Sequence, residues 1–324
     1  MAAESIGWWG VPLAILGGTL RGSAPFLFVS LGECLTEKSG KINLGLEGTL
    51  LLGAMSAYAV SYLTQGTVGT TIAPWLGVLV AGVAGAILGF IHAWLSQQPK
   101  VNDVAVGIAM IIFGSGVAFF LGKPFIQPSA PQLSAIPLGY LLQQIGLADW
   151  SALPQVQQAF RINPLFLVGM AIAPLMTWFF KTTRWGLFIR AVGDNPDAAL
   201  AMGISIHRVR MLCIMAGGFL AGIGGAYLSL YYPGSWSERI SSGQGLMAVA
   251  LVIFARWNPI QCLWASFLFG GAQAIAPALQ AVGVEGGYYL FNASPYVLTL
   301  LIMILTCSPK RTLSGAPGAL GTLN

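Results

Sequence analysis

Ionisable and amide side chains that could bind a solute or move a proton are concentrated in a few short stretches of this chain. The first, residues 32–48, is polar and rich in glycine and leads directly into a long apolar segment. Asn43 and Glu47 are four residues apart, so they share one face of a helix. A carboxylate inside an apolar helix is costly unless it faces a cavity or a partner. Glu47 therefore either lines a polar pathway or pairs with a nearby lysine, and both interpretations stay open. We expect three further charged residues of this stretch to be solvated: Glu37, Lys38 and Lys41.

The second and third stretches predict local structure more clearly than chemistry. Asp194 or Asn195 can cap a helix whose first turn contains Pro196, and Gly203 suits the position just after its end. The pattern predicts a short helix over residues 196–202, which on these grounds alone is an ordinary connector. Further along the chain, glycines flank Gln244, and Gln273 lies within an apolar run. Turn stabilisation for Gln244 and bonding between helices for Gln273 are the commoner uses of such glutamines.

No set of side chains in the sequence points to catalysis. The chain has only two histidines, His92 and His207, and its four cysteines are far apart with no CxxC pair. Ser115 lies between two glycines, as some catalytic serines do, but no histidine and aspartate accompany it. The phosphate-binding loop Gly-x4-Gly-Lys-Ser/Thr does not occur either. We therefore predict no catalytic residue, metal site or cofactor, and a membrane-embedded enzyme is a disfavoured alternative.

The elements that must position these stretches are membrane-spanning helices. Charged residues make up 8% of the 324 residues and apolar residues 56%, whereas about a quarter of a soluble domain is charged. A helix needs about 20 apolar residues to cross the hydrocarbon core. We predict an all-α, polytopic transmembrane bundle of about 8–10 spans within a single domain, residues 1–324. The candidate spans are 11–31, 43–64, 74–96, 101–121, 163–181, 208–230, 244–256, 259–280 and 288–307.

Lysine and arginine orient these spans, because they mark the cytoplasmic side of membrane proteins. The richest basic cluster surrounds residues 182–207 and consists of Lys181, Arg184, Arg190, Arg208 and Arg210. We therefore place 182–207 in the cytoplasm, and the sparsely charged segment 122–162 on the outer side. The orientation of the N-terminus stays open, because the first span is interrupted by Arg21 and Pro25. The net charge of +5 fits this membrane pattern and is no sign of nucleic-acid binding.

Three stretches in the same order resemble the permease subunits of bacterial ABC importers, and most closely the branch for nucleosides and simple sugars. They are residues 32–54, the loop at 184–204 and the turn at 251–259, and the glycine-rich run from Gly217 to Leu228 fits the same family. The resemblance covers roughly residues 10–310 and is less specific for substrate than for the superfamily. Two positions depart from the family pattern: Asp194, where glutamate is more usual, and Lys41, where an apolar residue is common.

The resemblance implies a subunit of the bacterial inner membrane that works by alternating access. Its expected partners are a cytoplasmic ABC ATPase, a second related permease in a heterodimer, a substrate-binding lipoprotein and membrane lipid. Branched-chain amino acids, urea or ribose-type sugars are alternative substrates, and an ion-coupled carrier is disfavoured because mid-span carboxylates are few. The segment 182–207 becomes a coupling loop, whose expected contacts with the ATPase are Gly193, Asn195, Pro196, Ala198, Ala199 and Gly203. The residues that we expect to line the translocation path are Asn43, Glu47, Gln244 and Gln273.

Overall fold

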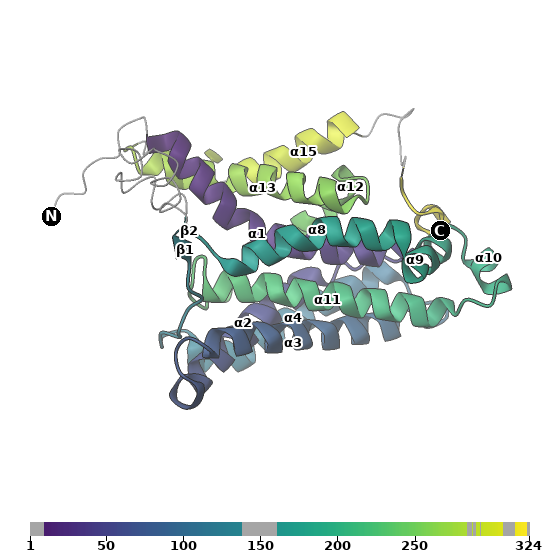
Figure 1. Ribbon diagram of the computed structural model, residues 1–324, viewed down its shortest axis with the longest axis horizontal. Coiled ribbons are helices and arrows are strands. Elements are labelled where there is room, and N and C mark those ends of the chain that lie inside the picture. The colour runs from purple at the N-terminus through teal and green to yellow at the C-terminus, as the bar shows by residue number, and fades with distance from the viewer. Residues whose placement is uncertain are drawn as a thin grey trace.

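The computed structural model describes residues 10–137, 161–283, 287, 290–291, 293–306 and 315–322, and most of them are helical. Long helices run side by side along the long axis of the molecule (Figure 1). They are α1 (Gly10–Lys38), α2 (Leu46–Val68), α3 (Ala73–Ser96), α4 (Asp103–Gly122), α8 (Pro164–Thr182), α11 (Ile206–Leu230), α13 (Pro259–Gln280) and α15 (Ser294–Thr306). Three shorter helices are α9 (Arg184–Asp194), α10 (Pro196–Ala201) and α12 (Gln244–Phe254).

Within the described residues, six helices are long and apolar enough to cross a membrane: α1, α3, α4 with the turn after it, α8, α11 and α13. Each predicted span coincides with a helix over most of its length, which confirms the all-α polytopic bundle. The remaining elements are small. Two 3₁₀ turns, η1 (Lys123–Phe125) and η2 (Gly318–Thr322), accompany a two-residue antiparallel pair, β1 (Ile136–Pro137) with β2 (Arg161–Ile162).

The two ends of the bundle differ. One end carries α9 and α10 with the predicted basic cluster, and we call it the basic end; β1 and β2 lie at the opposite end (Figure 1). Most of the predicted outer segment, residues 138–160, lies outside the described residues, as do the first nine residues and the lysine and arginine at positions 310 and 311.

Small residues allow the central helices to pack closely. α11 lies against α1, α2 and α3, and its glycines face the backbone of those neighbours. A Cβ atom on Gly218 would collide with the carbonyl oxygen of Gly85, and one on Gly225 would collide with that of Leu50. Such close approach of backbones is the way in which helices associate where lipid removes the hydrophobic driving force.

The first helix is longer than predicted, and the predicted solvated loop after it is wrong. α1 continues past residue 31 to Lys38, and Glu37 is only 2% exposed. The indole of Trp257 donates a hydrogen bond to the Glu37 carboxylate. Lys41 is also engaged: its Nζ lies 2.8 Å from Asp103 Oδ1 and donates to the carbonyl oxygen of Ser96 at 3.0 Å. The partners of Glu37 and Lys41 lie far away in the sequence. The polarity of the neighbouring residues therefore wrongly predicts that these two side chains are solvated.

Helix α12 covers only part of the bundle length. Its 11 residues span about 16 Å at 1.5 Å per residue, whereas the hydrocarbon core is about 30 Å thick. The preceding residues, 231–243, are irregular and complete the distance from the end of α11. The prediction of a short span at 244–256 is therefore right about its position, but it consists of a half-length helix that begins inside the bundle. Irregular backbone at this depth is tolerated where it is buried in protein or lines a cavity.

Candidate functional site

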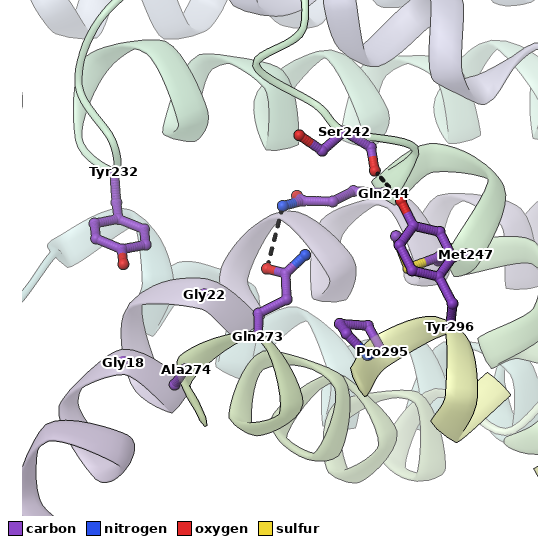
Figure 2. A pocket seen from close by; sticks show the side chains of 10 residues that line it. All are labelled: Gly18, Gly22, Tyr232, Ser242, Gln244, Met247, Gln273, Ala274, Pro295 and Tyr296. Carbon is purple, nitrogen blue, oxygen red and sulfur yellow. Dashed lines mark hydrogen bonds between the residues drawn. The ribbon is translucent and has the colours of Figure 1, made fainter. Parts of the chain in front are cut away.

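A cavity of about 240 Å³ lies where α12 begins. It is bounded by α1, α12, α13, the start of α15 and the irregular segment after α11 (Figure 2). Its lining is neutral throughout and combines amide, hydroxyl and small apolar groups. The lining residues are Gly18, Gly22, Tyr232, Ser242, Gln244, Met247, Gln273, Ala274, Pro295 and Tyr296.

Two glutamines face each other across this cavity. Gln244 Nε2 donates to Gln273 Oε1 at 3.3 Å (Figure 2). The other amide atom, Gln244 Oε1, is buried and has no hydrogen-bond partner. An unpaired buried carbonyl oxygen costs about 1–3 kcal/mol, so this atom is a ready acceptor for a hydroxyl or N–H group of a solute. The structure thus brings together two of the four predicted path residues.

The local sequence explains why Gln244 points into the cavity. Gly243 adopts a left-handed conformation with φ of 79°, which a side chain would strain. This turn redirects the chain into α12, so that Gln244 becomes the first residue of the helix. Gln273 reaches the same place from the middle of α13, a helix that Asn258 caps by accepting a hydrogen bond from the backbone N–H of Ile260.

Two tyrosines at the cavity were not singled out in the sequence. The hydroxyl of Tyr296 donates to the carbonyl oxygen of Ser242 at 2.9 Å, and Tyr232 lies on the other side of the glutamine pair (Figure 2). The guanidinium of Arg21 lies 5.5 Å from the centre of the Tyr232 ring. Aromatic residues are common near membrane interfaces, so only the fold distinguishes these two from the other tyrosines.

Asn43 does not line the cavity and instead stabilises the turn between α1 and α2. Its backbone N–H donates to Glu33 Oε1 at 2.7 Å, and its side-chain oxygen accepts from the backbone N–H of Gly45 at 3.0 Å. Asn43 is 1% exposed. These bonds return the chain from the end of α1 to the start of α2.

Glu47 also lies outside the cavity lining, and it pairs with neither Lys38 nor Lys41. Its carboxylate contacts the start of α12 through three donors, which are the hydroxyl of Ser241 and the backbone N–H groups of Gly243 and Gly245. Glu47 therefore touches the segment that carries Gln244 without facing the cavity itself.

The predicted short helix exists at the basic end as α10. Asn195, not Asp194, is its cap, and the Asn195 side chain accepts from the backbone N–H of Ala198 at 3.0 Å. Gly203 has a φ of 78°, as predicted for the residue after the helix end. The sequence did not reveal α9, which precedes α10 and is capped by the hydroxyl of Thr183.

Two of the six predicted coupling residues are buried. Ala199 is 2% exposed within the apolar core at the basic end. Gly193 is buried against α1, where a Cβ would collide with the carbonyl oxygen of Lys38. Ala199, an expected contact with the ATPase, is therefore not accessible on the surface of this chain. The exposed large apolar residues in and just after α10 are Leu200 and Met202, with exposed fractions of 61% and 81%.

Comparisons with known proteins give one consistent family. A family model described as branched-chain amino acid transport system / permease component matches residues 7–307. The guanosine ABC transporter permease protein NupQ of Bacillus subtilis is 33% identical over 89% of this chain and 90% of its own length. The nucleoside ABC transporter permease protein NupC of Lactococcus lactis is 29% identical over 90% of this chain and 91% of its own. TsgC13 of Haloferax volcanii, named as a candidate glucose ABC transporter permease, is 32% identical over 83% and 79%.

Each of these three organisms contains a second, more distant match, as two examples illustrate. NupP of Bacillus subtilis is 23% identical over 79% of this chain and 72% of its own length. NupB of Lactococcus lactis is 25% identical over 83% and 74%. Each is also named as a permease protein of a guanosine or nucleoside ABC transporter, so these relatives occur as paired permease components.

Proposed function

We propose that this chain forms half of the membrane pore of an ABC importer for nucleosides or simple sugars. The chain belongs to the family described as branched-chain amino acid transport system / permease component. The chain is a multi-pass membrane protein and a transport component. It moves its substrate by exposing the cavity to one side of the membrane and then to the other. Binding in both states, with different contacts in each, can drive such a cycle without covalent chemistry.

The observation that carries the substrate class is the neutral lining of the cavity, with the free carbonyl oxygen of Gln244. Carboxamides both donate and accept hydrogen bonds, as nucleobase edges and sugar hydroxyls do. An amino acid brings a carboxylate and an ammonium group, and burying such charges without partners is costly. No charged side chain is among the described lining residues, so a neutral polar substrate fits better than a branched-chain amino acid. The names of NupQ and NupC support the same choice.

The exposed surface of α10 supports contact with a separate ATPase at the basic end. Leu200 and Met202 are exposed close together at the basic end, and neighbouring exposed apolar side chains can mark a protein-interaction site. ATP hydrolysis in that partner would then move α10 and, through it, the helices around the cavity. This assignment keeps the predicted coupling loop at 182–207 and shifts its contact residues toward the exposed side of α10.

A second permease in a heterodimer is supported by the pairing of relatives. This chain is 33% identical to NupQ and 23% to NupP, and 29% identical to NupC and 25% to NupB. It therefore corresponds to one member of each pair, and we assign the other half of the pore to a chain of the NupP and NupB kind. The outer segment at 122–162 would receive substrate from a binding lipoprotein, and the complex would lie in the bacterial inner membrane.

Uptake by cells lacking the gene tests this function directly. Deletion should abolish uptake of labelled guanosine, uridine or glucose and leave uptake of labelled leucine unchanged. Complementation with the intact gene should restore the lost uptake. Loss of leucine uptake alone would overturn the substrate class and leave the permease role standing. Normal uptake of all four compounds, in a strain without a second system for them, would contradict the proposal.

A further inference from the structure

We infer that Glu47 is a positioning residue for the cavity, because its carboxylate fixes the first turn of α12 and thereby sets the place of the Gln244 carboxamide. This inference rests on the proposed function, since it assumes that Gln244 meets the substrate. It assigns Glu47 a role different from both sequence interpretations, which made it a path-lining residue or the partner of a lysine.

Glu47 is bonded to α12 through both carboxylate oxygens. Oε1 accepts from Ser241 Oγ at 2.5 Å and from the backbone N–H of Gly243 at 3.0 Å. Oε2 accepts from the backbone N–H of Gly245 at 2.7 Å. Hydrogen bonds to an ionised acceptor are shorter and stronger than neutral ones. The three donors lie on either side of Gln244, so the carboxylate defines the backbone from which that side chain extends.

The charge of Glu47 suits the start of a helix. The unpaired N–H groups of the first turn and the helix dipole favour an anion there. Glu47 is 8% exposed, and the one ion pair among the described residues joins Lys41 to Asp103. Within the described part of the chain, Glu47 is thus compensated by backbone dipoles and a hydroxyl instead of a cation. An amide at this position would offer one acceptor and a donor that opposes the N–H groups.

The backbones of α2 and α12 are close enough to require glycine. A Cβ atom on Gly245 would lie 2.6 Å from Glu47 Cα and 2.7 Å from Glu47 Oε2, so any side chain at 245 would push the two helix starts apart. On its other side the turn is bonded to α15, because the hydroxyl of Tyr296 donates to the carbonyl oxygen of Ser242. The first turn of α12 is therefore fixed between α2 and α15, next to the cavity.

The test compares the selectivity of variants, because a purely structural defect lowers transport of every substrate by the same factor. The intact transporter is expressed in cells lacking the native gene, and maximal uptake rates are measured for labelled guanosine, uridine and glucose. The readout is the ratio of rates for the two compounds transported best. Saturating substrate removes differences that arise from the affinity of the binding protein.

Glu47→Gln should change this ratio by about fivefold, the effect of roughly one hydrogen bond. Gln244→Ala should change it in the same direction. In the double variant the change should equal that of Gln244→Ala alone, because Glu47 acts only through Gln244. Ser241→Ala, which removes one donor without altering charge, should give a smaller change of the same sign and serves if Glu47→Gln does not fold. Asp103→Asn is the control for a purely structural defect: it also alters a buried carboxylate, away from the cavity, so it should lower all rates by the same factor and leave the ratio unchanged.

The possible failures are distinguishable. Unchanged ratios for both Glu47→Gln and Ser241→Ala, or fully additive effects with Gln244→Ala, would overturn the positioning role while leaving the cavity intact. An unchanged ratio in Gln244→Ala would remove the cavity from the transport path and the inference with it. If the native transporter takes up none of the three compounds, the proposed function is contradicted instead.

Discussion

The indole of Trp257 donates a hydrogen bond to the carboxylate of Glu37, a residue 220 positions earlier in the chain. This bond joins the turn after α12 to the last turn of α1 at the basic end. Next to it, the thiol of Cys34 contacts the carbonyl oxygen of Trp257 at 3.2 Å. Trp257 is 4% exposed and Glu37 is 2% exposed, so the pair is shielded from solvent.

Replacement of Trp257 by phenylalanine should destabilise the protein. The change keeps most of the apolar volume but leaves the buried Glu37 without its donor, which costs roughly 1–3 kcal/mol. The midpoint of thermal aggregation of the detergent-purified protein should fall. Trp264→Phe is the control, because Trp264 is 65% exposed. Equal midpoints for the two variants would show that the Glu37 bond contributes no stability.

Replacement of Gln273 by alanine should impair transport of the preferred substrate at least several-fold without reducing the amount of protein in the membrane. Gln273 is the partner of Gln244 in the cavity, and its loss leaves a second polar group without a hydrogen bond. Uptake of labelled substrate, normalised to membrane protein by immunoblot, measures the effect. Gln280→Ala, an exposed glutamine at the end of the same helix, should transport normally. If both variants behave alike, the cavity does not contact the substrate.

Replacement of Leu200 by arginine should uncouple transport from ATP hydrolysis. Leu200 is exposed on α10, so a charge there should repel an apolar partner surface without disturbing the fold. We expect loss of substrate-stimulated ATPase activity in the complete transporter, with normal insertion. Gln98→Arg adds the same charge elsewhere at the basic end and should retain coupling. Ala199→Arg is unsuitable for this purpose, because Ala199 is buried and the variant should fail to fold.

Replacement of Asp103 by asparagine should lower stability more than a surface change does. It leaves the ammonium group of Lys41, whose side chain is 15% exposed, without its carboxylate. Breaking a buried pair costs about 3–5 kcal/mol, whereas apolar replacement of both partners is often neutral. The melting midpoint should therefore fall in Asp103→Asn and recover in the double variant Lys41→Met with Asp103→Leu. No recovery in the double variant would mean that the pair is needed for more than charge balance.

The sequence predicts the helices well because the membrane imposes their length. Apolar runs of about 20 residues have few alternatives in lipid, and most predicted spans end within a few residues of the observed helices. The short helix α10 was also predictable, since Asn195, Pro196 and Gly203 carry a local signal for its start and end. Its buried face was not, because burial of Ala199 depends on packing against other helices.

The partners of the polar residues could not be predicted in the same way. Glu37 and Glu47 meet residues about 200 positions further along the chain, and no periodicity encodes such a meeting. The continuation of α1 through Glu37 was missed for that reason, since an isolated carboxylate looks solvated until its donor is known. Gln244 and Gln273 were identified as polar residues inside spans, but only the fold places them around one cavity with two tyrosines.

Both ends of α12 are fastened to the hairpin formed by α1 and α2. Glu47 holds the first turn, and Glu37 holds the tryptophan just beyond the last turn. An α-helix is stiff along its axis, so a rod attached at both ends cannot stretch or slide relative to its supports. A displacement of the turn at Trp257 would therefore be transmitted along α12, whose 11 residues span about 16 Å, to the first turn, which carries Gln244. α12 is therefore a rigid connection between the basic end and the cavity.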